Sequence, residues 1–253
     1  MLAASASASA TAEDQFSLGT GFDYSTGKYG SSTTTDMLYI PVVAKYETDD
    51  LTLKLTVPYL RVTGTSSGVI RGVGRVKPGS PMMTTTTKST TATNSASGLG
   101  DIVAAAGYTV YDQDVLSIDV VGKVKLGTGN ANTGLGTGKN DYSAQLDGYY
   151  TINKTTVFAT AGYKIVGQPA GLTLNNVAFG TAGASQKIND KTSAGIMLDI
   201  MQSASPAATG PIEVTAFATK KLSKMLKVQV SVLKGLSNGS PNMGVGAMVT
   251  GIF

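Results

Sequence analysis

Lysine and carboxylate side chains recur at alternate positions in several segments of this chain, and they are its main candidates for chemistry. In the segment 115–126, Lys123 and Lys125 share one face with Asp119, whereas the opposite face is aliphatic. A strand with one charged and one aliphatic face is suited to a wall between water and an apolar medium. The following side chains are predicted to face the water: Lys54, Asp119, Lys123, Lys125, Gln145, Asp147, Lys164, Lys187, Asp199, Glu213, Lys220, Lys227 and Gln229.

The composition excludes most enzyme chemistry. The 253 residues include no Cys, no His and no Trp, so the chain has no thiol nucleophile, no histidine relay and no usual zinc site. Only 14% of the residues are charged and the net charge is +4, without a clustered basic face, so nucleic acid is not an expected partner. We expect no catalytic residues, no metal and no cofactor.

Two weak motifs lead to the same expectation. The stretch GLGTGKND (134–141) resembles a phosphate-binding loop, but Thr133 stands where the first glycine is needed and Asn140 follows Lys139 where Ser or Thr is needed. It is predicted to be an external glycine-rich loop. The carboxylates of Asp119 and Asp147 could in principle act as an acid–base pair, but no sequence feature places them together, and charges that face a water-filled lumen are far more common.

Strict alternation of apolar and polar residues predicts about twelve strands, each long enough to span a bilayer when tilted. In LTLKLTVPY (51–59), the leucines share one face with Val57 and Tyr59. The predicted strands are 15–24, 36–46, 51–63, 99–111, 115–126, 141–150, 156–166, 177–187, 192–201, 212–220, 225–234 and 243–253.

The connections between these segments alternate between short and long, as in an outer-membrane barrel with tight periplasmic turns and long external loops. The short ones are 47–50, 112–114, 151–155, 188–191 and 221–224. The fold class predicted from this pattern is all-β: an up-and-down antiparallel transmembrane β-barrel of about 12 strands.

Aromatic residues mark both ends of the predicted strands, as expected for two girdles at the membrane–water interfaces. One girdle is predicted to contain Phe16, Tyr46, Tyr108, Tyr150 and Phe253. The other is predicted to contain Phe22, Tyr24, Tyr59, Tyr142 and Tyr163.

Two segments stand apart from this pattern. Residues 1–12 are rich in Ala and Ser and end in Ala-Thr-Ala, which indicates a signal-peptide remnant or a disordered tail before a single barrel domain, 13–253. The segment 64–98 is predicted to be a long external loop whose basic residues, Arg71, Arg75 and Lys77, could attract anions or lipopolysaccharide phosphates.

Three stretches resemble the outer-membrane transporter family named after the meta-pathway of phenol degradation. They are YIPVVAKYETDDLTLKLTVPYLRVTG (39–64), VIRGVGRV (69–76) and GLGDIVAAAGYTVY (98–111). The resemblance implies a monomeric or trimeric barrel that carries small organic molecules. The insert 78–97 departs from the family's pattern.

Together these features predict a bacterial outer-membrane channel or transporter for the passive passage of small organic solutes through a narrow lumen. The alternatives are a closed structural or surface-binding barrel, an export conduit, and a soluble all-β adhesin. The expected partners are outer-membrane lipids, lipopolysaccharide and a small-molecule solute.

Overall fold

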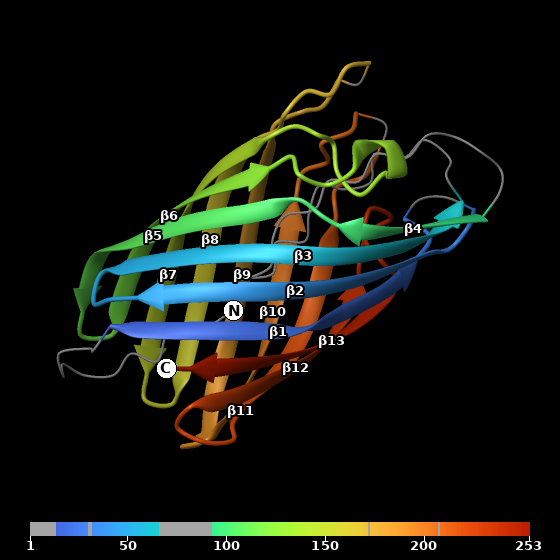
Figure 1. Cartoon of the computed structure of the whole chain (residues 1–253). Coiled ribbons are helices and arrows are strands. Elements are labelled where there is room, and N and C mark those ends of the chain that lie inside the picture. Colours follow the sequence, from blue (N-terminus) through green and yellow to red (C-terminus); the bar gives the residue numbers. More distant parts are fainter. Residues whose placement is uncertain (1–13, 30–31, 66–92, 172, 207) are drawn as a thin grey trace.

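The alternating segments form the strands of a closed barrel in the computed structural model of the chain (Figure 1). The structure describes residues 14–29, 32–65, 93–171, 173–206 and 208–253. The strands are β1 (Gln15–Gly27), β2 (Thr35–Glu47), β3 (Leu51–Thr65), β4 (Thr93–Leu99), β5 (Ile102–Gln113), β6 (Leu116–Leu126), β7 (Asp141–Ile152), β8 (Thr155–Ile165), β9 (Val177–Asn189), β10 (Thr192–Met201), β11 (Ile212–Lys221), β12 (Leu226–Gly235) and β13 (Met243–Ile252). A short 3₁₀ helix, η1 (Ala131–Thr133), lies between β6 and β7.

Antiparallel pairing between successive strands closes the sheet on itself. The barrel closes where β1 pairs with both β2 and β13. The strands β4 and β5 pair with different parts of β3, so they occupy one position in tandem and twelve positions surround the axis. The predicted up-and-down barrel of about 12 strands is therefore confirmed.

The strand segment at the fourth position of the barrel wall begins earlier in the sequence than the alternation pattern predicts. Residues 93–98 lie in the segment predicted to be a loop, but together with Leu99 they form β4, which pairs with Tyr59–Thr65 of β3. The sequence TNSASGL does not alternate between apolar and polar residues, so its strand conformation is set by the backbone edge of β3. The Gly100 N–H then donates to the Pro58 carbonyl at 2.9 Å, where β4 gives way to β5.

The predictions for 1–12 and for Arg71, Arg75 and Lys77 lie outside the described residues, as does most of the insert 78–97.

The barrel wall is apolar outside and polar inside. Leu53 of β3 and Val230 of β12 point outward and are 44% and 50% exposed. The inward-facing Thr56 and Thr215 are buried, with 1% and 0% exposed. This reverses the arrangement of a soluble protein and is typical of a barrel surrounded by lipid.

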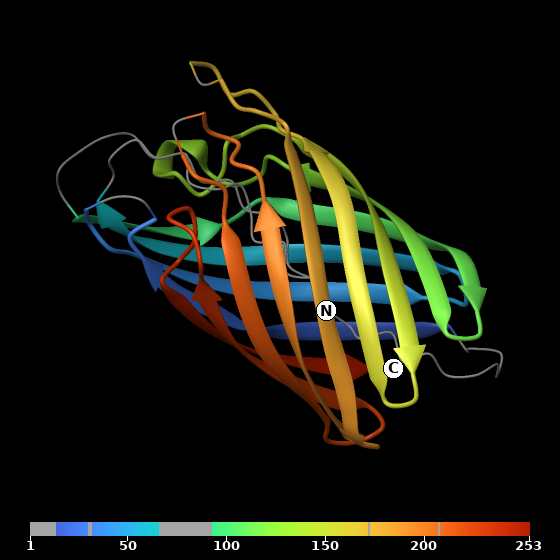
Figure 2. The ribbon, with the colours of Figure 1, turned by 180° about the vertical axis from the view of Figure 1, so that it is seen from behind.

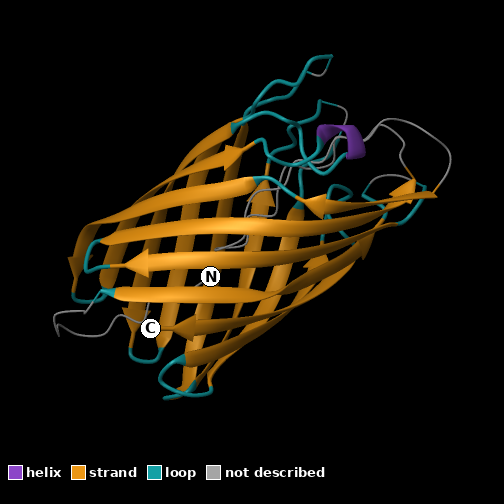
Figure 3. Ribbon diagram, viewed as in Figure 1, coloured by secondary structure: helices purple, strands orange, loops and turns teal. Residues whose placement is uncertain are grey.

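The two ends of the barrel differ in the length of their connections (Figure 3). Tight turns at one end use residues with positive φ, such as Asp114 at 51° and Asn153 at 54°. The long connections gather at the other end, where η1 lies, and the view from behind shows the same separation (Figure 2). We call these the short-turn end and the long-loop end. In the described part of the chain, no helix is long and apolar enough to cross a membrane.

Candidate functional site

The barrel interior brings together the side chains that the sequence marks as candidates. Ten of the side chains predicted to face the water lie on strand faces that turn away from the apolar outer surface. Lys125, Gln145, Asp147, Lys164, Asp199 and Glu213 are buried, and Lys54, Asp119, Lys123 and Lys227 are half-buried.

Two other lysines predicted to face the water do not lie in this interior. Lys220 is exposed and stands opposite Val228, so it shares the outward face, because directly opposed residues lie on the same side of a sheet. The alternation of the segment breaks down near its end, where Lys220 and Lys221 are consecutive. Lys187 is exposed at the short-turn end and forms an ion pair of 3.6 Å with Asp190.

A continuous row of cross-strand neighbours carries four lysines. Lys45 stands opposite Lys54, which stands opposite Ala105, and the row continues through the next three strands. This basic row is Lys45, Lys54, Ala105, Lys123, Ser143 and Lys164 on β2, β3, β5, β6, β7 and β8. It begins near the short-turn end of β2 and finishes near the long-loop end of β8, so it winds along the wall.

A second row carries four carboxylates on the neighbouring part of the wall. The acidic row is Asp119, Asp147, Thr160, Thr181, Asp199 and Glu213 on β6 to β11. Threonine hydroxyls donate to its carboxylates: Thr160 to Asp147 at 2.6 Å and Thr181 to Asp199 at 2.7 Å. The row also runs from the short-turn end to the long-loop end.

Gln145 joins the two rows on β6 and β7. The Lys123 ammonium donates to the Gln145 side-chain oxygen at 2.5 Å, and the Gln145 amide donates to both Asp147 carboxylate oxygens at 2.7 Å. On each strand that carries both rows, the member of the basic row and the member of the acidic row are four residues apart, which is about 13 Å. The Gln145 side chain lies between the two rows and bridges Lys123 to Asp147.

Lys125 has a different role from the other interior lysines. Its ammonium is buried between the carboxylates of Asp101 at 2.7 Å and Asp141 at 3.4 Å. Asp101 also accepts from the Gly129 N–H at 2.8 Å, and Asp141 accepts from the Gly167 N–H at 2.9 Å. This charged cluster therefore anchors two long connections to the wall. Sequence reasoning missed Asp101 and Asp141, which lie at strand boundaries where alternation gives no information.

The connection 127–140 folds over the long-loop end and places an apolar side chain in the interior. Leu135 is 4% exposed and packs with Tyr39 of β2 and Leu60 of β3. The connection starts after β6, so it reaches across the β4–β5 position to make this contact. The glycine-rich stretch 134–141 lies in this connection at the long-loop end, and its central residues, Gly134 to Thr137, are buried.

A further apolar cluster, also at the long-loop end, joins the strand ends to the connections 166–176 and 202–211. Its buried members are Val166, Leu174, Val177, Phe179, Met201 and Ala204. The two clusters lie at the same end of the barrel.

Three inward phenylalanines lie flat on the wall instead of filling the lumen. Each ring covers a glycine directly opposite on the next strand, where a β-carbon would collide with it. The pairs are Phe158 with Gly183, Phe179 with Gly162, and Phe217 with Gly195. Pairing of an aromatic ring with a glycine is a known way to stabilise a curved sheet. Sequence alternation misses this because the glycines carry no side chain to count.

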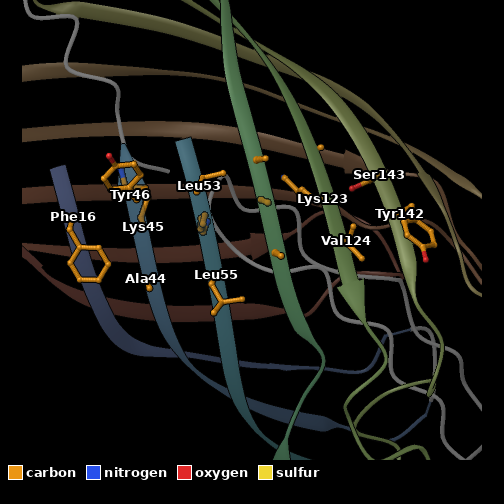
Figure 4. Close-up of a pocket in the computed structure, with 15 residues that line it drawn as sticks. Phe16, Ala44, Lys45, Tyr46, Leu53, Leu55, Lys123, Val124, Tyr142 and Ser143 are labelled. Carbon is orange, nitrogen blue, oxygen red and sulfur yellow. The ribbon is translucent and has the colours of Figure 1, made fainter. Parts of the chain in front are cut away.

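The described cavity lies on the outer surface of the wall (Figure 4). Small residues on β2, β5 and β6 form its floor, between the outward side chains of Leu53, Leu55 and Val124. The lysines of the basic row contribute only to the floor of this groove, because their side chains point inward from positions between the outward-facing residues. This groove faces the apolar surroundings and is separate from the interior.

Seven of the ten aromatic residues predicted for the girdles lie at or near an end of their strand, whereas Phe22, Tyr59 and Tyr108 lie closer to the middle of theirs. Nine of the ten are exposed on the outer surface, and Tyr46 is half-buried and donates to the Asp14 carboxylate at 2.5 Å. Tyr24 similarly donates to Asp36 at 3.1 Å.

A closed antiparallel barrel with an apolar exterior, a charged interior and unequal ends defines a transmembrane β-barrel of the bacterial outer membrane. The model of the family described as "Putative MetA-pathway of phenol degradation" matches residues 13–250, so the chain belongs to this family. A search of curated protein sequences finds no match.

Solved structures share the fold. The COG4313 outer membrane channel from Pseudomonas putida F1 has a TM-score of 0.72 and 15% identity, with 97% of each chain covered. The KdgM porin has a TM-score of 0.56 and 12% identity, covering 93% of this chain and 98% of its own. The NanC porin has a TM-score of 0.50 and 8% identity, with the same coverage.

Proposed function

We propose that this protein is a passive channel of the outer membrane, through which small organic solutes pass along a narrow, charged lumen. The observation that carries the proposal is the pair of charged rows, each of which runs the length of the wall on its inner face. A barrel that served only as a scaffold could fill its interior with apolar side chains at lower cost. The fold it shares with an outer-membrane channel and with porins supports this function.

The proposed channel is embedded in the outer membrane. The exposed aromatic residues near the strand ends form two girdles in contact with lipid headgroups and lipopolysaccharide. The short-turn end faces the periplasm and the long-loop end faces outward. The lumen belongs to one chain, so either a monomer or a trimer could conduct.

Conductance in planar bilayers tests the proposal. The purified protein should give small single-channel steps with little preference between anions and cations, because the four lysines of the basic row balance the four carboxylates of the acidic row and Lys125 is paired with Asp101 and Asp141. The double variant Lys54→Glu/Lys123→Glu should move the reversal potential toward cations. The matched control Lys191→Glu/Lys224→Glu changes exposed turn lysines and should leave the ion preference close to that of the wild type.

A closed structural barrel is the second candidate, and the apolar clusters at the long-loop end favour it. Folded protein that gives no current at any voltage would establish this alternative and refute the channel.

A further inference from the structure

One region of the outer wall carries small side chains where other parts of the wall carry large ones. At mid-height, Gly148 of β7, Ala159 of β8 and Ala182 of β9 stand directly opposite one another in a row. Ala161 and Gly180 form the next row on β8 and β9. We call these five residues the small-residue face. Its three alanines are exposed on the outer surface, and these strands lie at the front in the view from behind (Figure 2).

Small residues on a membrane-facing wall favour contact with another protein wall, because they let two backbones approach closely and pack. The wall at β12 has the opposite character, since Val230 and Val232 point outward and are 50% and 58% exposed. The outer groove, which has a volume of about 720 Å³, lies next to the small-residue face on the side of β5 and β6. The outer wall from β5 to β9 is therefore flat or hollowed, as a surface that receives a neighbour would be.

The exposed turns at the short-turn end change the sign of their charge beside this face. The β2–β3 and β5–β6 turns carry aspartates, and the β7–β8, β9–β10 and β11–β12 turns carry lysines. Asp190 also lies among these lysines, where it is ion-paired with Lys187 at 3.6 Å. The sign therefore changes between β6 and β7. The exposed residues are Asp49, Asp50, Asp112 and Asp114 on the acidic turns and Lys154, Lys191, Lys221 and Lys224 on the basic turns.

The place where the sign changes lies beneath the small-residue face. A row of directly opposed residues runs across the strands, and the basic row climbs from the short-turn end of β2 to the long-loop end of β8. The strands therefore lean toward earlier strands as they rise, and the turns below the middle of β8 are β5–β6 and β7–β8. A twofold axis at this place sets Asp112 and Asp114 of one copy against Lys154 of a second copy. The contact occurs twice, because a twofold interface is self-complementary.

We propose that the small-residue face is the contact between two copies of this chain, related by a twofold axis along the membrane normal. A second copy fits this surface because the two adjacent turns supply both charges of the contact. An anionic lipid headgroup would neutralise Lys154 but would be repelled by Asp112 and Asp114 beside it. Each barrel keeps its own lumen, so the contact is independent of conduction.

Cross-linking through introduced cysteines tests the contact, since the chain has none of its own. Packed sheets lie about 10 Å apart, so Ala159→Cys and Ala182→Cys should each give a dimer with a bifunctional maleimide of about that length. Reconstitution at a low protein-to-lipid ratio limits random encounters, and Val230→Cys is the matched control that should stay monomeric. Asp114→Cys and Lys154→Cys should give a dimer when two differently tagged copies are refolded together, and much less when either is used alone.

Substitutions separate the charged contact from the packing of the walls. Lys154→Asp should raise the dissociation constant of the dimer about tenfold, which corresponds to about 1.4 kcal/mol for the two exposed contacts together. The further exchange Asp112→Lys/Asp114→Lys should restore it. Ala182→Leu should also weaken the dimer, because the longer side chain keeps the walls apart, whereas Ala216→Leu on the outer surface of β11 should not. Sedimentation equilibrium in density-matched detergent measures the mass, and heat-modifiable migration in gels reports folding.

A monomeric wild type without cross-links at Ala159 and Ala182 would overturn the inference, and so would equal cross-linking at Val230. A dimer that is unaffected by Lys154→Asp would also overturn it, because the axis then passes elsewhere. Monomers whose binding to phosphatidylglycerol vesicles falls in Lys154→Asp would assign the lysine to lipid headgroups instead. Currents in planar bilayers are the separate readout for the channel: monomeric Ala182→Leu should conduct like the wild type, so loss of the dimer leaves the proposed function standing.

Discussion

Leu135 is the side chain through which the connection 127–140 closes the long-loop end, so its replacement by alanine should open the channel further. It is 4% exposed and packs against Tyr39 and Leu60. Truncation of a buried leucine to alanine costs about 2–5 kcal/mol in a rigid core. A connection at the barrel mouth relaxes more easily than a core, so we take about 2 kcal/mol, which shifts the ratio of docked to undocked loop by about 30-fold.

Single-channel recording in planar bilayers measures this shift. Leu135→Ala should show larger steps and longer open periods than the wild type, because the loop leaves the lumen or occupies less of it. Leu236→Ala is the matched control, since Leu236 also lies in a long connection but is 58% exposed. Identical traces for Leu135→Ala and the wild type, in protein shown to be folded, would refute the view that this leucine narrows the lumen.

Three further predictions concern the anchor, the outer face and the topology. Lys125→Met leaves two buried carboxylates without their cation and should lower the free energy of unfolding in lipid by about 3–5 kcal/mol, measured by urea titration; equal stability would show that the cluster is dispensable. Val230→Lys should cost about 2–4 kcal/mol of insertion free energy, because Val230 lies in the middle of β12, whereas the inward-facing Gln229→Lys should be mild; similar losses in refolding yield would invert the assignment of faces. A cysteine at Asn238 should react with a membrane-impermeant maleimide on intact cells and a cysteine at Lys224 should not, and the reverse labelling would invert the topology.

Most of the fold is predictable from the sequence because a barrel wall has two opposite environments along its whole length. Each strand must alternate to satisfy both, so the pattern in 51–59 and in 115–126 marks the strands within a few residues. The exception is β4, whose small polar residues carry no pattern and follow the edge of β3. At the end of β11, the consecutive Lys220 and Lys221 likewise interrupt the alternation, so the pattern does not mark the faces there.

The candidate site is predictable only in part. Alternation places Lys54, Lys123 and Asp147 on inward faces, but it does not show that Lys54 and Lys123 belong to one row while Asp147 belongs to another. Each row depends on the register of several strand pairs in succession, including β3 with β5, which a long segment separates in the sequence. The register is set by backbone pairing, and no single segment encodes it.

By itself the sequence determined the class of fold, the faces of the strands and the unequal ends, because these follow from local periodicity and from the lengths of the connections. Only the tertiary structure decided that Lys125 is an anchor and Lys164 a buried ammonium, although both read as equivalent inward lysines. The physical reason is that Asp101 and Asp141 approach Lys125 from other parts of the chain, whereas the Lys164 Nζ has no hydrogen-bond partner among the described residues. The placement of Leu135 on Tyr39 likewise depends on the closed barrel, which brings β2 beneath a connection that starts from β6.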